Sequence, residues 1–368
     1  MGKNTVKLAF FTDMHYKKGM YAATVEDLEA VIERAHDNEV DFIMHGGDFC
    51  NDYKDSPEMV NRLVNNKYGY KFYGVYGNHE LEGPNSMEDI TPYITNDENV
   101  TWGTVDGKYD AYTAYYYFEC KGIRFICLDT NYSFNPELNE YEHNRACSYG
   151  PPKGNSGVNS LSPRQLEWLE KILLDAAEKN IKCVVVSHAG FSCQFEANSC
   201  DYDKVRTLFD RINETKPGTV IASLNGHWHA NCHEFANGVL YFNFNATRNI
   251  CWLSTKTPHY TEDHHFMYTH FDRDGNAIER YERPLSDLWM SLNTWYSKDA
   301  LTAIVTVDTD GNIEVDGCES EFMHGIGLPD YVSACRAPKI TSGKWSVKKS
   351  VTYRDFHRYL PEKSSIAF

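Results

Sequence analysis

The segment KFYGVYGNHE, residues 71–80, decides the fold. Its apolar first part predicts a short buried strand, which ends where Gly77 opens a turn. Three side chains that can bind a metal or transfer a proton follow at once: Asn78, His79 and Glu80. Such an ending is typical of α/β sheets, because ligands there bind beyond the carboxyl ends of the strands. The segment therefore predicts an α/β protein with its site at a sheet edge.

Four more predicted strands end in the same way, in residues 6–15, 40–48, 182–188 and 218–229. The carboxylates and imidazoles that end them are Asp13, His15, Asp48, His188, His227 and His229. Side chains two residues apart on a strand point to the same face, so we expect Asp13 with His15, and His227 with His229, to share a side. One such residue alone is more often structural, but five segments with this ending predict a metal centre.

Segments with the period of amphipathic helices separate these strands, at residues 24–38, 56–66, 162–180 and 203–213. Thr24 and Ser162 stand at predicted N-cap positions, and Pro163 stands at a first helical position. The alternation of strand and helix predicts βαβ units. Hairpins are predicted at residues 114–130, 265–282 and 301–317, and the last two turn at an Asp-Gly pair.

Length, composition and charge restrict the class of protein. The 368 residues are 42% hydrophobic and 24% charged, which is typical of a globular chain that stays in water. The net charge of −16 argues against binding to long nucleic acids, whose binders carry a basic face. A small anionic substrate fits only if a local cation reverses the potential. No feature of the sequence predicts the oligomeric state.

Cysteine usage and apolar runs bear on the compartment. The 11 cysteines are odd in number and contain no CxxC pair, which favours reduced thiols over a disulfide framework. No apolar run approaches the length of a membrane span, so we expect no membrane partner. We therefore predict a cytoplasmic protein. A signal peptide removed beforehand is the alternative.

The five blocks DxH, GD, GNHE, a lone His and GHxH, read in this order, resemble the calcineurin-like metallophosphoesterase superfamily over roughly residues 6–250. The resemblance implies two mixed β-sheets stacked between helices, a four-layer α/β/β/α fold. We predict a catalytic domain in residues 1–265, with a loop insertion at 131–160 near the site. Residues 266–368 would form a β-hairpin-rich extension that could pack on this domain.

The resemblance also implies a ligand set for two divalent ions, Mn, Fe or Zn. One ion would be held by Asp13, His15 and His229, and Asp48 would bridge to the other. The ligands of the second ion would be Asn78, His188 and His227. Oxygen and nitrogen ligands of this kind bind all three metals, so the ligand set does not identify the metal.

Two ions about 3.5–4 Å apart would convert a bridging water to hydroxide and clamp the in-line displacement at phosphorus. The resemblance gives His79 a catalytic role, as donor to the leaving oxygen or stabiliser of the developing charge, and Asp48 a catalytic role as the bridge. Glu80 would orient its neighbours. Asp52 is a candidate partner for His79, although it stands one residue beyond the family's usual offset. No tyrosine occupies that offset, so a tyrosinate-ligated iron is not predicted.

Substrate recognition is the least specified part of the hypothesis. The 131–160 segment carries side chains that could stack on a base or clamp a phosphate: Tyr132, Phe134, Tyr141, His143, Arg145 and Tyr149. Residues 191–202 could form a facing wall. The alternative is a surface insertion unrelated to substrate. For His45, His143 and His233 taken singly, a structural or exposed role is favoured.

Three functions remain open at this point. The leading hypothesis is a dinuclear hydrolase of a small phosphodiester or phosphomonoester. The second is a binding or scaffolding module that retains the fold without turnover. A phosphoprotein phosphatase ranks third, because the motifs expected around its site are not evident.

Overall fold

Two large β-sheets form the centre of the computed structural model, which describes residues 4–16, 23–50, 63, 65–81, 87–135, 139–143, 156–192, 202–252, 265–271, 277–284, 294–322 and 334–349. The first sheet has the order β20-β19-β18-β1-β2-β3. Its parallel half is β1 (Thr5–Phe11), β2 (Phe42–His45) and β3 (Lys71–Gly74). Its antiparallel half is β18 (Ala303–Asp308), β19 (Asn312–Asp316) and β20 (Gly343–Ser346).

The second sheet has the order β12-β13-β11-β10-β6-β5-β4. Its four parallel strands are β6 (Ile123–Cys127), β10 (Lys182–Val186), β11 (Val220–Asn225) and β13 (Val239–Asn243). Its antiparallel edges are β4 (Thr101–Trp102), β5 (Tyr116–Cys120) and β12 (Cys232–Ala236). The hairpin predicted at 114–130 is β5 with β6, whereas β12 was not predicted.

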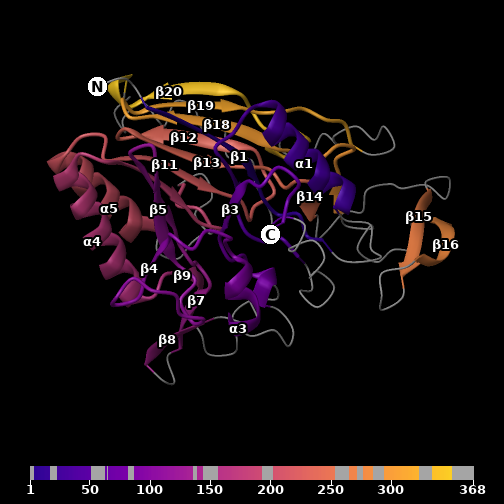
Figure 1. The fold of residues 1–368 in the computed structure, drawn as a ribbon, viewed down its shortest axis with the longest axis horizontal. Coiled ribbons are helices and arrows are strands. Elements are labelled where there is room, and N and C mark those ends of the chain that lie inside the picture. The colour runs from indigo at the N-terminus through magenta and orange to yellow at the C-terminus, as the bar shows by residue number, and fades with distance from the viewer. Residues whose placement is uncertain are drawn as a thin grey trace.

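Apolar faces of the two sheets and three helices make four layers. The rings of Phe42 on β2 and Phe125 on β6 lie 5.0 Å apart, so the main core lies between the sheets. Helix α1 (Val25–Asp37) packs on β1 and β2, while α4 (Pro163–Lys179) packs on β10 and α5 (Tyr202–Thr215) on β11. Figure 1 shows α4 and α5 side by side, well away from α1. The predicted four-layer α/β/β/α fold is confirmed.

Local signals place the helix ends. The Thr24 side chain accepts a hydrogen bond from the Asp27 amide, and the Asp27 carboxylate accepts one from the Thr24 amide. Two amide groups at the start of α1 are thereby satisfied. Ser162 caps α4 in the same position, and Asn180 ends it in the left-handed conformation with φ of 57°. The helix predicted at 56–66 lies mostly outside the described residues.

The composition predicted a loop insertion at 131–160. The structure instead has strands in part of this segment. These strands are β7 (Tyr132–Asn135), β8 (Glu140–His143) and β9 (Ser156–Ser160), and they form a sheet of order β8-β7-β9. Each of these strands is only four or five residues long and rich in polar residues, which is why the sequence pattern did not reveal them.

The C-terminal hairpins are confirmed. One is β15 (His265–Phe271) with β16 (Ala277–Pro284), which stands apart from the large sheets in Figure 1. The other, β18 with β19, adds to the first sheet because β18 pairs antiparallel with β1, with Leu8 opposite Val305. A further pair joins β14 (Asn249–Trp252) to β17 (Thr294–Tyr296). The domain boundary at residue 265 stays a prediction.

Short helices complete the elements near the sheets: η2 (His79–Leu81), α3 (Met87–Ile90), η3 (Thr91–Tyr93), η8 (Ala334–Arg336) and η9 (Val347–Lys349). Among the described residues, seven cysteines are present as free thiols. In that same part of the chain, none of the helices has the length and apolar character needed to cross a membrane. The cytoplasmic location stays a prediction.

Asp97 gives the fold a measurable dependence on pH. Its buried carboxylate accepts hydrogen bonds from Lys71 Nζ and Tyr73 Oη, at 2.8 and 2.6 Å. Burial alone would raise the pKa of Asp97, but these donors and Asn99 lower it to about 2, from 3.8. Because the folded-state pKa lies below the unfolded value, Asp97 stabilises the fold above pH 4, and this contribution disappears as the pH falls toward 2.

We therefore expect Asp97→Asn to lower the free energy of unfolding by about 1–2 kcal/mol at pH 7. The difference from the wild type should shrink between pH 4 and 2, as measured by urea denaturation at each pH. Glu98→Gln, an exposed neighbour, is the matched control and should change little. A difference that stays constant with pH would contradict this account.

Candidate metal centre

The carboxyl ends of the parallel strands in both sheets face one shared site. Direct contacts join the two sheets there. The amide of His227, beyond β11, donates to the Asp13 carboxylate beyond β1 at 2.9 Å. His188 Nδ1, beyond β10, lies 2.8 Å from the carbonyl oxygen of Gly46 beyond β2. Because a carbonyl only accepts, this Nδ1 carries the hydrogen, and Nε2 of His188 is left facing the site.

Asp13, His15 and His229 form the first group of the site, and all three are buried. His15 Nε2 lies 2.9 Å from His229 Nε2, and His229 Nε2 lies 3.2 Å from Asp13 Oδ1. Two imidazole nitrogens and a carboxylate oxygen therefore converge on one point, in the combination that transition-metal ions prefer.

Asp48, His188 and His227 form the second group. His188 Nε2 lies 3.1 Å from Asp48 Oδ2 and 3.1 Å from His227 Nδ1. The same Asp48 oxygen lies 3.7 Å from His15 Nε2 in the first group. Asp48 thus stands between the two groups, where a bridging ligand would be needed.

The backbone reaches this arrangement through left-handed residues and not through strand alternation, so the predicted reason for the pairing is wrong. β1 ends at Phe11 and β11 at Asn225, before the residues in question. The φ angles are positive, between 48° and 72°, at Asp13, His15, Asp48, His227 and His229. Non-glycine residues in this region cost about 1–3 kcal/mol each and are held only where the surroundings fix them. Such strain is typical of functional sites.

The glycines of the motifs allow the loops to approach one another. A Cβ on Gly47 would lie 2.4 Å from His188 Nδ1, and one on Gly77 would lie 2.1 Å from Asp48 Oδ1. At Gly226 it would lie 2.2 Å from Asp13 Oδ2. Glycine is required at these positions because the candidate ligands occupy the space of a side chain.

Gly226→Ala is accordingly expected to displace the Asp13 carboxylate and weaken metal binding by the first group. Overpacking of this kind should also cost about 1–3 kcal/mol of stability. Titration of chelator-treated protein with Mn²⁺ and thermal unfolding would measure the two effects. Gly74→Ala is the control, since its Cβ would meet no atom closer than 3.2 Å. Equal Mn²⁺ affinity and equal thermal stability of Gly226→Ala and Gly74→Ala would contradict the steric argument.

The charges of the two groups suit a cation. Burial by itself disfavours the charged forms, but the imidazoles of His229 and His188 hold the pKa of Asp13 well below its usual range, and those of His188 and His79 do so for Asp48. Burial and neighbouring imidazoles lower the pKa of His15 and of His227 to about 3. Burial by itself lowers the pKa of His188, but the Asp48 and Asp13 carboxylates outweigh it and raise that pKa to about 10. Two carboxylates and four imidazoles therefore meet in a buried space. This donor set fits divalent Mn, Fe or Zn, whose binding displaces the protons that the imidazoles carry.

Asn78 and His79 stand in the turn after β3, and His79 reaches the site. Asn78 is buried, and the His79 amide donates to Asp48 Oδ1 at 2.9 Å. The His79 ring stands at 4.7 Å from that of His15, its Nε2 is 3.9 Å from Asp48 Oδ2, and its side chain is 16% exposed. His79 therefore borders the site on a side that solvent reaches.

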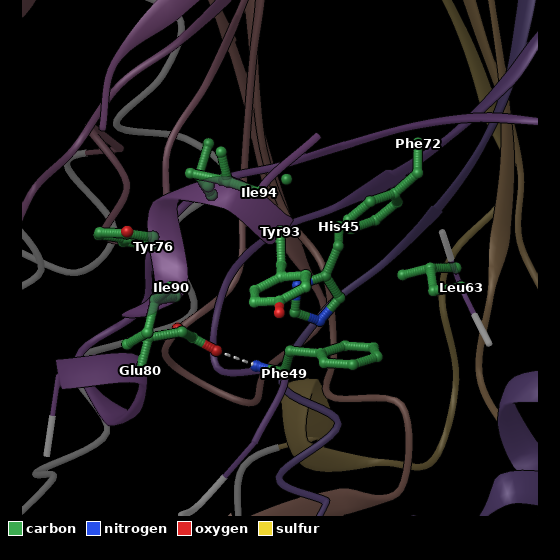
Figure 2. Close-up of a pocket in the computed structure, with 11 residues that line it drawn as sticks. His45, Phe49, Leu63, Phe72, Tyr76, Glu80, Ile90, Tyr93 and Ile94 are labelled. Atoms are coloured by element: carbon green, nitrogen blue, oxygen red, sulfur yellow. Dashed lines mark hydrogen bonds between the residues drawn. The ribbon is translucent and has the colours of Figure 1, made fainter. Parts of the chain in front are cut away.

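Glu80 supports the turn that carries Asp48. Its carboxylate accepts hydrogen bonds from the amides of Asp48, Phe49 and Gly77. Figure 2 shows the bond to Phe49 at the edge of a small apolar cavity of about 40 Å³, which His45 also lines. Burial and the Asp48 carboxylate raise the pKa of Glu80 to about 7. Glu80 thus ties the Asp48 turn to the turn after β3, and its orienting role stays a prediction.

The predicted substrate residues lie at different places. Tyr132 and His143 are opposite each other on β7 and β8, with ring centroids 4.8 Å apart, and Tyr141 pairs with Phe134. His143 Nε2 lies 2.7 Å from Asp129 Oδ2, so His143 has a structural partner. Three predicted residues lie outside the described part of the chain: Asp52, Arg145 and Tyr149. Of the facing wall, only Phe191, Ser192 and part of α5 are described.

The other two histidines that were considered make structural contacts. His45 Nδ1 accepts a hydrogen bond from the Gly47 amide at 3.1 Å. His233 stacks on Phe242, with ring centroids 5.5 Å apart and an interplanar angle of 13°. These positions agree with the structural roles favoured for them.

Two side chains next to the site were not predicted. Asn159 on β9 approaches His227, and Arg336 in η8 donates to the carbonyl oxygens of Trp228 and His229. Neither residue belongs to a motif, and each is far in sequence from the ligand that it supports. Only the pairing of distant segments brings them there, so no signal in the sequence identified them.

Comparison with known proteins decides the family. The family model for calcineurin-like phosphoesterases matches residues 6–231, which is more than half of the chain. The chain belongs to this family. The phosphoesterase carries candidate metal groups where the family motifs end, and it is a metal-dependent phosphoric ester hydrolase. Among curated proteins, none is significantly similar in sequence.

The phosphoesterase shares its fold with a solved structure and is similar to others. A dimetal phosphatase from Danio rerio is 14% identical with a TM-score of 0.51, and the match covers 86% of this chain and 98% of that one. The purple acid phosphatase PPD1 from yellow lupin is 13% identical with a TM-score of 0.46, over 100% of this chain and 57% of that one. At 14% identity, the likeness to the Danio rerio phosphatase shows the fold alone.

Proposed function

We propose that the phosphoesterase is a dinuclear hydrolase of a small phosphomonoester or phosphodiester. The observation that carries the proposal is the place of Asp48, whose Oδ2 lies 3.1 Å from His188 and 3.7 Å from His15, between two groups that could each hold an ion. Bound Mn, Fe or Zn ions would supply an acidified water and neutralise charge on the phosphoryl group.

The protein residues would position and complete this site. Asp13, His15 and His229 would hold one ion, Asn78, His188 and His227 the other, and Asp48 would bridge. His79, on the solvent side, is placed to hold a proton near the leaving oxygen or to stabilise charge on the phosphoryl group. Glu80 would keep the Asp48 turn in place through three backbone hydrogen bonds.

The charge of the protein and the inserted sheet favour a small substrate in this proposal. The net charge of −16 disfavours a long polyanion, whereas one phosphoryl group needs only the local positive charge of the ions. The inserted β8-β7-β9 sheet touches the second metal group through Asn159, so its aromatic residues Tyr132 and Tyr141 are candidates to contact the organic part of the substrate.

A substrate and metal screen tests the proposal. Protein purified without chelator, supplied with Mn²⁺, Fe²⁺ or Zn²⁺, should hydrolyse para-nitrophenyl phosphate or bis-para-nitrophenyl phosphate, and the ratio of the two rates should report monoester or diester preference. A chelator should abolish hydrolysis, and added metal should restore it. Absence of hydrolysis with every metal, in protein that binds two ions, would instead support a binding module on the same fold.

A further inference from the structure

Asn159 connects the inserted sheet to the second metal group. It lies on β9, is 6% exposed, and adopts the left-handed conformation with φ of 58°. Its side-chain Nδ2 lies 3.2 Å from Nε2 of His227. The contact joins residues 68 positions apart, so it exists only because the sheet docks at the end of β11.

The orientation of His227 determines which atom donates and which accepts in the contact with Asn159. His227 Nδ1 lies 3.1 Å from His188 Nε2 and belongs to the group with Asp48, so Nδ1 faces the metal position. A ligating imidazole nitrogen carries no hydrogen, so the neutral ring must carry its hydrogen on Nε2. With metal bound, Nε2 donates, and Asn159 must accept through its amide oxygen. A half-turn of the amide places that oxygen where Nδ2 stands.

The sheet that carries Asn159 is itself fixed to the rest of the fold. Next to Asn159, Ser160 pairs with Tyr132 of β7, and β7 pairs with β8. His143 on β8 contacts the buried Asp129 at 2.7 Å, just beyond the end of β6. Asn131, directly before β7, donates through Nδ2 to the Tyr76 carbonyl oxygen at 3.2 Å, close to the turn that carries Asn78. The end of the sheet next to Asn159 is thus fixed by contacts to Asp129 and Tyr76.

We propose that Asn159 is a positioning residue for His227 and that the inserted sheet is therefore part of the second metal site. The inference rests on the proposed dinuclear function and extends it to the insertion. A partner that holds the outer nitrogen of a ligating histidine fixes its tautomer and ring orientation. Loss of such a partner typically weakens metal binding by about 10–100-fold.

Metal binding, and not turnover, provides the test. The test uses four chelator-treated proteins: the wild type, Asn159→Ala, Asn159→Asp and Ser160→Ala. Each is titrated with Mn²⁺, and binding is measured by calorimetry and by the electron spin resonance signal of free Mn²⁺. We expect Asn159→Ala to bind one ion as the wild type does and the other about 10–100-fold more weakly. Ser160→Ala, the adjacent residue on β9, should bind both ions like the wild type.

Asn159→Asp separates the proposed contact from a general effect on the sheet. A carboxylate can only accept a hydrogen bond, so it should keep both affinities close to those of the wild type if His227 Nε2 donates. The thermal unfolding of metal-free Asn159→Ala and Asn159→Asp would show whether both variants remain folded.

Three results would overturn the inference. If Asn159→Ala binds both ions as tightly as the wild type, Asn159 does not position His227, and the proposed dinuclear function is unaffected. Equal weakening in Asn159→Ala and Asn159→Asp would show that an acceptor at this position is not what His227 requires. A wild-type protein that binds only one ion would overturn the proposed function together with this inference.

Discussion

Asp48→Asn is expected to lose both ions and to lower kcat/KM for para-nitrophenyl phosphate by roughly 1,000-fold, about 4 kcal/mol of transition-state stabilisation. The Asp48 carboxylate lies within 3.7 Å of His15 and 3.1 Å of His188, which belong to different metal groups. An amide carries no charge, so each ion would lose an anionic ligand. Metal analysis of the purified variant and steady-state kinetics would measure the two effects.

Two controls define this expectation. Asn78→Ala removes the proposed neutral ligand of one ion and should lose that ion while keeping the other. Asp97→Asn changes a buried carboxylate that is bonded to Lys71 and Tyr73, and should keep both ions. An Asp48→Asn protein that still holds two ions would show that this carboxylate is not a bridge.

His79→Ala should lower kcat by about 100- to 10,000-fold, the range that a positioned acid or base contributes, without loss of metal. The ring lies beside His15 at 4.7 Å and is reached by solvent, so it can contact a substrate that occupies the site. Because its proposed role concerns the leaving oxygen, KM should change much less than kcat. Kinetics combined with metal analysis provide the measurement.

The competing role for His79 is that of a ligand. A ring nitrogen of His79 lies within 4.8 Å of a ring nitrogen of His15 and a carboxylate oxygen of Asp48, which makes a third possible group. Loss of one ion from His79→Ala would assign it to that group and contradict the catalytic role. His36→Ala, an exposed histidine on α1 that stacks on Tyr68, is the matched control and should change neither quantity.

Much of the fold was predictable because its signals are local. Helices α1 and α4 are specified by local features. Each begins at a capping residue, Thr24 or Ser162, and carries apolar residues at the helical period along its length. The Asp-Gly pairs at 274–275 and 310–311 in the sequence likewise predicted their hairpins. The inserted sheet and β12 were missed, since β12 exposes His233 in part and β7 to β9 are short and rich in polar residues.

The sequence by itself determined which side chains can bind metal, in what order they occur, and that the strands before them are parallel members of an α/β fold. Only the tertiary structure decided how they meet. Asp13, His15 and the GHxH histidines converge because their backbones are left-handed and because glycines let loops of two sheets touch, which no local pattern specifies. Asn159 and Arg336 reach the centre through an inserted sheet and a C-terminal segment, and such contacts depend on the packing of parts far apart in the chain.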